Sequence, residues 1–122
     1  MKIDSKVLII IPAYNEEENI LSTYKSIVNS KYNYDVIVIN DGSKDNTEQI
    51  LLDNNIPHIK LIHNLGIGGA VQTGYRYAYD NDYDIAVQMD ADGQHDVNYV
   101  KNIIDPILKN DCDICIGSRF IE

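Results

Sequence analysis

Two aspartates stand one residue apart in the segment Asp90-Ala91-Asp92-Gly93, directly after the apolar residues 85–89. Carboxylates about 4 Å apart repel each other by about 4 kcal/mol at an effective dielectric constant near 20. A divalent cation removes this repulsion, and a small set of oxygen ligands with room for water and phosphate suits Mg²⁺ or Mn²⁺ better than zinc. Asp90 and Asp92 are therefore candidate metal ligands. The alternative is an Asx turn that caps the following helix.

A third candidate carboxylate, Asp41, lies in the segment Asn40-Asp41-Gly42-Ser43 after the apolar residues 36–39. Such a tetrapeptide is also typical of an ordinary turn. In the functional interpretation, a carboxylate at the rim of a pocket accepts hydrogen bonds from a base imide N–H or from ribose hydroxyls. This contact would fix a nucleoside without adding charge beside its diphosphate.

Glycines gather in the run from His63 to Ala70, which follows the apolar residues 59–62. Backbone N–H groups that no side chain covers can approach anionic or polar atoms, so Gly68 and Gly69 are candidate ligand-binding residues. A dinucleotide-binding fingerprint would follow the first strand instead, and the chain has no Gly-Lys-Ser/Thr phosphate loop. His63 by itself is more typical of a structural strand end than of a ligand.

The positions of these residues depend on five apolar, β-branched runs that alternate with helical patterns. The runs comprise residues 7–11, 36–39, 59–62, 85–89 and 114–116. This alternation predicts an α/β fold with an open, mostly parallel sheet and flanking helices. Ligands of such sheets bind beyond the carboxyl ends of the strands. The polar segments that follow the first four runs are therefore expected to converge on one edge.

Four helices are expected around these strands. The first would be capped by Asn15, with the glutamates at 16–18 in its first turn and residues 20, 21, 24, 27 and 28 facing the core. The second would begin at Asp45, with Glu48 completing a capping box. The third would follow the glycines near residue 68 and bury residues 70, 71, 74, 75 and 78. The fourth would use apolar residues between 97 and 108, with Pro106 bending or shortening it.

The chain has 122 residues, a formal net charge of −9 and 44% hydrophobic content, which is typical of one soluble globular domain. This charge opposes an extended contact with nucleic acid or anionic lipid, because both are negative. Residues 7–11 are too few for a signal sequence or membrane span, so we expect a cytoplasmic location. Cys112 and Cys115 fall on opposite faces of a predicted strand, which favours ordinary thiols.

No repeat, low-complexity segment or linker divides residues 1–122, so we expect one domain. The sequence stops at Glu122, after a strand and a polar turn, without the helix that normally covers such a sheet. We therefore expect a domain truncated at its carboxyl end. Its uncovered sheet face and edge predict self-association into homo-oligomers.

Taken together and in this order, the motifs resemble those of family 2 glycosyltransferases, and most closely their dolichyl-phosphate or polyprenyl-phosphate sugar synthase-like branch. The resemblance spans nearly the whole chain. It rests on residues 11–17, 40–47, 63–74, 89–95 and 117–120, which read IPAYNEE, NDGSKDNT, HNLGIGGAVQTG, MDADGQH and GSRF. One departure lies at position 40, where the family often has Asp and this chain has Asn; the nearby Asp41 is expected to tolerate it.

The resemblance implies that residues 1–122 are the Rossmann-like, nucleotide-sugar-binding portion of a GT-A domain. Asp41 would contact the base or the ribose of the donor. Gly68 and Gly69 would let their loop close over it. Four residues that follow the first strand would line the nucleoside pocket: Pro12, Ala13, Tyr14 and Glu16.

The same resemblance implies roles for the residues on the catalytic side of the site. Asp90 would face the sugar or ribose, and Asp92 would hold Mg²⁺ or Mn²⁺ against the diphosphate. Gln94 would lie near the sugar or the acceptor phosphate. Arg119 would contact phosphate and, with the metal, neutralise the departing nucleoside diphosphate.

The implied reaction is the inverting transfer of a sugar from a UDP- or GDP-sugar to a polyprenyl phosphate or a glycan hydroxyl. If the acceptor is a lipid, the reaction would take place at the cytoplasmic face of a membrane. A lipid phosphate is already ionised, whereas a hydroxyl needs a base, which the family supplies from a second half. The alternative is that these residues bind the nucleotide sugar without turnover. A sugar-nucleotide pyrophosphorylase would need a Gly-rich, basic loop after the first strand, which this sequence lacks.

Overall fold

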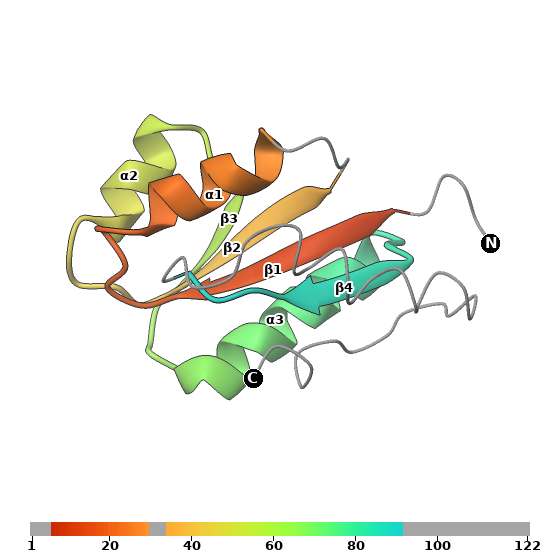
Figure 1. Ribbon diagram of the computed structural model, residues 1–122. Coiled ribbons are helices and arrows are strands. Elements are labelled where there is room, and N and C mark those ends of the chain that lie inside the picture. The colour runs from red at the N-terminus through yellow and green to blue at the C-terminus, as the bar shows by residue number, and fades with distance from the viewer. Residues whose placement is uncertain (1–5, 30–33, 92–122) are drawn as a thin grey trace.

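The computed structural model describes residues 6–29 and 34–91, which form one open, parallel sheet with helices on both faces (Figure 1). The order of the strands across the sheet is β3-β2-β1-β4. Every neighbouring pair is parallel. The predicted fold class is therefore confirmed. The strands are β1 (Val7–Ala13), β2 (Asp35–Asp41), β3 (His58–Leu61) and β4 (Ile85–Gln88).

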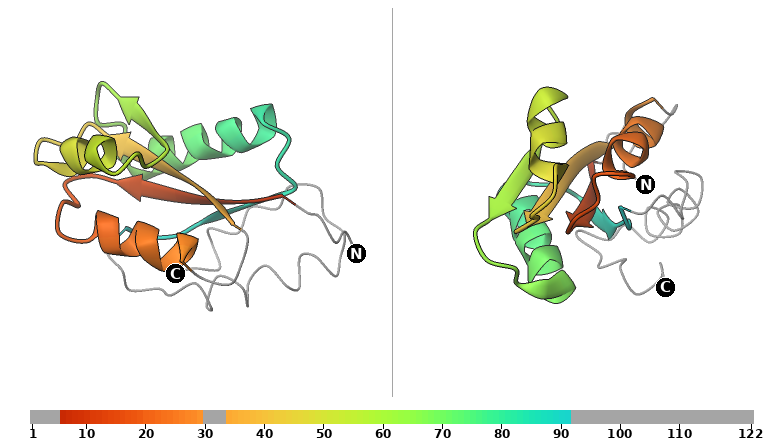
Figure 2. Two further views of the ribbon diagram at one scale, coloured as in Figure 1. Left: turned by 90° about the horizontal axis from the view of Figure 1, so that it is seen from above. Right: turned by 90° about the vertical axis from the view of Figure 1, so that its left-hand side faces the viewer.

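Three helices connect these strands: α1 (Ile20–Val28), α2 (Thr47–Asp53) and α3 (Gly66–Asp80). Figure 1 shows α1 and α2 on one face of the sheet and α3 on the other, and Figure 2 shows α1 and α3 on opposite sides. Right-handed crossovers require this arrangement, because the chain steps from β1 to β3 in one direction and then returns past β1 to β4.

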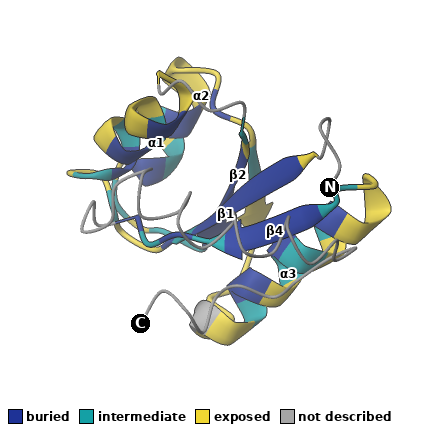
Figure 3. Ribbon diagram, turned by 45° about the vertical axis from the view of Figure 1, so that its right-hand side comes forward, coloured by how far each residue is buried: buried dark blue, intermediate teal, exposed yellow. Residues whose placement is uncertain are grey.

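The central strand β1 is buried on both faces, which explains its uninterrupted apolar sequence. Ile9 and Ile11 pack in the cluster that includes α1 and α2 residues, whereas Leu8 and Ile10 pack in the cluster that includes α3 residues. Figure 3 shows β1 and β4 as buried strands. Gly74 allows α3 to lie close to the sheet, since a Cβ there would come within 2.4 Å of Ile10 Cγ2.

The predicted start of the first helix is wrong. α1 begins at Ile20 and not after Asn15, whose φ of 55° places it in the left-handed region. The N–H groups of Asn19 and Ile20 both donate to the Glu16 carbonyl, so the glutamates form a turn before the helix. On the predicted apolar face, Ile20 and Ile27 are buried, but Val28 is 43% exposed.

The second and third helices also begin elsewhere than predicted. α2 begins at Thr47, whose N–H donates to Asp45 Oδ1 at 2.9 Å. The residue that precedes α2 is Asn46 and not Asp45, so the predicted capping box does not form, and Glu48 instead pairs with Lys60 at 3.0 Å. α3 begins at Gly66, two residues before the expected position. Of its predicted stripe, Ala70, Tyr75 and Ala78 pack against the sheet, Gly74 lies close to Ile10, and Val71 is buried.

Several predictions fall on residues 92–122, outside the described part of the chain: the fifth strand, the fourth helix and the two cysteines. The domain limits and the self-association stay predictions. Among the described residues, no helix has both the length and the apolar character needed to span a membrane.

Candidate functional site

A cavity of about 320 Å³ opens beyond the carboxyl ends of β1, β2 and β4. β1 and β4 are neighbours that do not follow one another in the chain, and such a switch point is where open α/β sheets form a ligand-binding crevice. Within the described residues, six of the lining residues are predicted site residues, and the other two are Ala70 and Ala91. The six are Pro12, Ala13, Tyr14, Glu16, Asp41 and Asp90.

Asp90 enters the cavity because the chain leaves β4 immediately before it. The Met89 N–H still donates to the Ile10 carbonyl at 2.9 Å, so the sheet pairing continues up to this point. The Thr23 hydroxyl of α1 donates to the Ala91 carbonyl at 3.0 Å and fixes the other side of the turn. The side-chain amide of Gln88 lies 3.5 Å from Asp90 Oδ1. The backbone on both sides of Asp90 is thus anchored.

The charged side chains that line the cavity within the described residues are all carboxylates: Glu16, Asp41 and Asp90. Such a cavity repels an anionic ligand unless a cation accompanies it. Carboxylate oxygens suit Mg²⁺ or Mn²⁺, which keep several waters and need one or two protein carboxylates. Among residues 6–29 and 34–91, no three acidic, histidine or cysteine side chains cluster as a complete metal site. The second predicted ligand, Asp92, lies outside the described residues, as do Gln94 and Arg119.

Asp41 is 4% exposed, and its carboxylate joins β2 to the start of α3. Oδ1 accepts the Leu65 N–H at 2.7 Å, and Oδ2 accepts the Gly66 N–H at 2.9 Å. A carboxylate has about four acceptor sites, so two are left for a ligand. Asp41 therefore has a structural function, in fixing the start of α3, that the sequence did not indicate.

Gly68 and Gly69 lie in the first turns of α3, but they are not among the residues that line the cavity. Gly69 packs on Leu65, because a Cβ at Gly69 would stand 2.6 Å from Leu65 Cβ. Gly66 has the unusual backbone, with a φ of +82°. The sequence showed a cluster of glycines but not which of them the turn requires.

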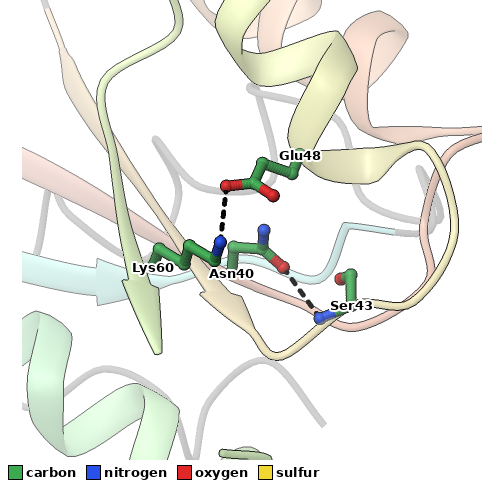
Figure 4. Close-up of polar contacts among 4 residues, drawn as sticks. All are labelled: Asn40, Ser43, Glu48 and Lys60. Carbon is green, nitrogen blue, oxygen red and sulfur yellow. Dashed lines mark hydrogen bonds and ion pairs between the residues drawn. The ribbon is translucent and has the colours of Figure 1, made fainter. Parts of the chain in front are cut away.

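Asn40, at the position where this chain departs from the resemblance, is 1% exposed at the end of β2. Its Oδ1 accepts the Ser43 N–H at 3.2 Å and closes a turn around Asp41 and Gly42 (Figure 4). An amide oxygen and a carboxylate oxygen can both accept this bond. The structure therefore explains how Asn is accommodated here.

Comparison with known proteins decides the family. The family model of glycosyl transferase family 2 matches residues 8–122. The chain belongs to glycosyl transferase family 2. Among relatives in this family, it is 38% identical to the UDP-N-acetylglucosamine–dolichyl-phosphate N-acetylglucosaminyltransferase of Methanococcus voltae, over 95% of this chain and 53% of the relative. It is 35% identical to the dolichol-phosphate mannosyltransferase of Pyrococcus furiosus, over 96% of this chain and 34% of that relative.

The chain thus spans about half the length of the first of these family 2 relatives and a third of the second. A solved structure, glucosyl-3-phosphoglycerate synthase of Mycobacterium tuberculosis with Mn²⁺, UDP and glucosyl-3-phosphoglycerate, is 25% identical. It superimposes with a TM-score of 0.68 over 86% of this chain and 40% of that one. These comparisons confirm the GT-A fold and the resemblance to dolichyl-phosphate and polyprenyl-phosphate sugar transferases.

Proposed function

We propose that the cavity binds a nucleoside-diphosphate sugar together with Mg²⁺ or Mn²⁺, as the donor site of a glycosyltransferase. One observation above all supports this proposal. Residues from three separate strand ends, represented by Tyr14, Asp41 and Asp90, line a single cavity at the switch point of the sheet. In a family 2 chain, these are the segments in which we expected the nucleoside, the ribose and the metal to bind.

The charge of the cavity supports the metal. A nucleoside diphosphate would meet the carboxylates of Glu16, Asp41 and Asp90, and a divalent cation would convert that repulsion into attraction. We assign the cation to Asp90 and Asp92. When bound, it would stabilise the negative charge that develops on the departing diphosphate. Arg119 would add to this effect by contacting phosphate.

At the other end of the cavity, Pro12, Ala13 and Tyr14 would form the wall against the nucleoside. Tyr14 is 41% exposed, so its ring is accessible to a ligand. The two free acceptor sites of the Asp41 carboxylate would take hydrogen bonds from the base or ribose. Gly68 and Gly69 would cover the donor from α3, and Gln94 would lie near the sugar.

The reaction would be an inverting displacement at the anomeric carbon. An acceptor oxygen forms the new bond to this carbon while the bond to the diphosphate oxygen breaks, and the nucleoside diphosphate leaves. A polyprenyl phosphate is the preferred acceptor, because the relatives named above act on dolichyl phosphate and a phosphate oxygen needs no base. The enzyme would work at the cytoplasmic face of the membrane. A second candidate, binding without turnover, is favoured for residues 1–122 alone by their partial coverage of these relatives.

Calorimetric titration of the 122-residue chain with UDP, UDP-glucose, GDP and GDP-mannose, each with and without Mn²⁺, tests the donor site. We expect one of the two nucleotides to bind with one-to-one stoichiometry, only when the metal is present. Asp90→Asn should abolish this binding, while Asp80→Asn, at an exposed residue paired with Arg76 on α3, should not change it. The absence of metal-dependent binding for all four compounds would rule out the proposal. Binding without sugar transfer would support the second candidate.

A further inference from the structure

The loop between β1 and α1 and the loop between β2 and α2 are joined by a reciprocal pair of hydrogen bonds. The Asn15 N–H donates to Ser43 Oγ at 3.0 Å, and the Lys44 N–H donates to Asn15 Oδ1 at 2.8 Å. Asn15 adopts a φ of 55°, in a region that Asn tolerates better than most residues. Both the backbone and the side chain of Asn15 thereby face the second loop.

Thr47 and Asp45 extend this connection to the next two residues of the first loop. The fully buried Thr47 accepts the Glu16 N–H at 3.0 Å with its Oγ1 and donates its hydroxyl hydrogen to Asp45 Oδ1. Asp45 Oδ2 accepts the Glu17 N–H at 3.2 Å. Because a hydroxyl has a single hydrogen, the bond to Asp45 orients the Thr47 lone pairs toward Glu16.

Three successive N–H groups of the first loop, at residues 15–17, are therefore held by side chains of the second loop and of Thr47, the first residue of α2. We name the four residues whose side chains make these bonds the loop clamp: Asn15, Ser43, Asp45 and Thr47. None of the four lines the cavity. The first of the two joined loops nevertheless contains Tyr14 and Glu16, and the second directly follows Asp41. Tyr14, Glu16 and Asp41 all line the cavity.

We propose that the loop clamp consists of positioning residues that preorganise the nucleotide cavity, by fixing Tyr14 and Glu16 at a set distance from Asp41. This inference rests on the proposed function, because it assumes that the cavity binds a nucleotide. A cavity that is already ordered does not have to be ordered by the ligand. The apparent affinity for the nucleotide decreases when a smaller fraction of the molecules has the binding-competent arrangement. Loss of one clamp bond should therefore weaken binding although no ligand contact is removed.

The isosteric variant Thr47→Val tests this directly, since it keeps the shape of the side chain and removes the hydroxyl. Thr47→Ser restores the hydroxyl and serves as the rescue variant. Thr73→Val is the matched control, because the Thr73 hydroxyl donates only within α3, to the Gly69 carbonyl at 2.9 Å. For each protein, the dissociation constant for the Mn²⁺ complex of UDP or GDP, thermal unfolding and amide hydrogen exchange at residues 15–17 are measured.

We expect Thr47→Val to raise the dissociation constant by roughly fivefold or more, the effect of one net hydrogen bond, and to accelerate exchange at Glu16. Thr47→Ser should return both values to within about twofold of the parent. Unchanged affinity in Thr47→Val, or an equal loss in Thr73→Val, would overturn the inference. If Thr47→Val does not fold, Ser43→Ala takes its place, with faster exchange expected at Asn15 and weaker binding.

The two proposals fail separately in this experiment. If the parent chain binds neither nucleotide, the proposed function is wrong. Slow, clamp-dependent exchange at residues 15–17 without nucleotide binding would show that the clamp is only a structural element of the fold. Normal binding with no effect of the clamp variants would contradict the clamp alone.

Discussion

The two sides of the cavity are built in different ways. On the side of β1 and β2, the loop clamp holds several backbone groups through several side chains. On the other side, α3 brings Ala70 to the cavity. The turn before α3, residues 62–65, is hydrogen-bonded to β2 by the Asp41 carboxylate, and its residues Ile62 and Leu65 are 85% and 57% exposed. Among the described residues, several side-chain hydrogen bonds thus hold the β1 and β2 side, whereas one carboxylate, Asp41, holds the start of α3. Single substitutions should therefore have graded effects on the β1 and β2 side and abrupt effects on the start of α3.

Substitution of Asp41 should have the largest effect, because its two backbone partners lose a charged acceptor at once. We expect Asp41→Ala to lower the free energy of unfolding by about 3 kcal/mol in urea denaturation and to abolish nucleotide binding. Asp41→Asn keeps one carbonyl oxygen and should lose about half as much. If Asp41→Ala is as stable as the parent, the start of α3 does not depend on this carboxylate.

Alanine substitutions at two glycines of α3 should change the free energy of unfolding in opposite directions. Gly66 has a φ of +82°, so Gly66→Ala should destabilise the chain by about 1–2 kcal/mol although there is space for a Cβ. Gly68 has no atom within 4 Å of an added Cβ, and Gly68→Ala should stabilise α3 by up to about 1 kcal/mol. Equal effects of the two changes in urea denaturation would contradict the assigned backbone. Weaker nucleotide binding in the stable Gly68→Ala variant would support a direct contact with the donor.

Asp45, a residue of the loop clamp, should make the free energy of unfolding depend on pH. Burial opposes its ionisation, but hydrogen bonds from the Thr47 hydroxyl and from the N–H groups of Thr47 and Glu17 outweigh it, so the Asp45 pKa is lowered. A carboxyl group whose pKa is lowered by folding raises the free energy of unfolding when the pH is above the ordinary pKa of about 3.9. This contribution to stability is lost as the pH falls through the folded-state pKa. Asp45→Asn should therefore be less stable than the parent at pH 7, with the difference shrinking below about pH 4. Asp53→Asn, on the exposed end of α2, controls for the loss of one charge.

The smallest effect is expected for the ion pair that joins α2 to β3. Lys60 and Glu48 lie 3.0 Å apart with side chains 56% and 37% exposed (Figure 4). Because water screens such a pair, Lys60→Ala should change the free energy of unfolding by less than about 0.5 kcal/mol and leave nucleotide binding unchanged. A loss comparable with that of Asp41→Ala would show that β3 and the start of α3 have a second essential support.

The sequence predicted the elements that depend on local pattern. The apolar runs located β1, β2 and β4 to within two residues, and the strand-end rule placed Asp41 and Asp90 beside one cavity. It failed where a partner is distant in the chain. The Asn15 amide caps no helix because it binds Lys44, 29 residues away, and the start of α3 is fixed by an aspartate 24 residues before Leu65.

Among the described residues, the two lining residues that the sequence did not indicate are alanines. Ala70 and Ala91 have no reactive group, so only packing brings them to the cavity wall. The glycine run predicted a close approach between backbone and ligand, but the φ values distinguish Gly66 from its neighbours. The family resemblance supplied the expected roles of the site residues, and the three-dimensional structure supplied the arrangement of those that it describes.

A second cavity of about 320 Å³ provides an internal control for the central proposal. It lies toward the amino end of β2, and its lining includes Tyr24 of α1 and Tyr77 of α3. The other described lining residues are Val28, Tyr34, Asp35, Val36, Pro57 and Tyr83. Its carboxylate, Asp35, accepts the Tyr83 hydroxyl at 2.7 Å. A nucleotide that bound here would be far from Asp41, which lies at the opposite end of β2, and would contact none of the residues that line the first cavity.

The most direct test of the donor site is paramagnetic broadening of backbone amide NMR signals by Mn²⁺, with UDP or GDP added in slight excess over the chain. Binding at the carboxyl ends of the strands should broaden Asp90, Ala91 and Ala13 first and leave Tyr24 and Tyr83 sharp. Broadening centred on the second cavity, or none at a nucleotide concentration that saturates binding, would contradict the account.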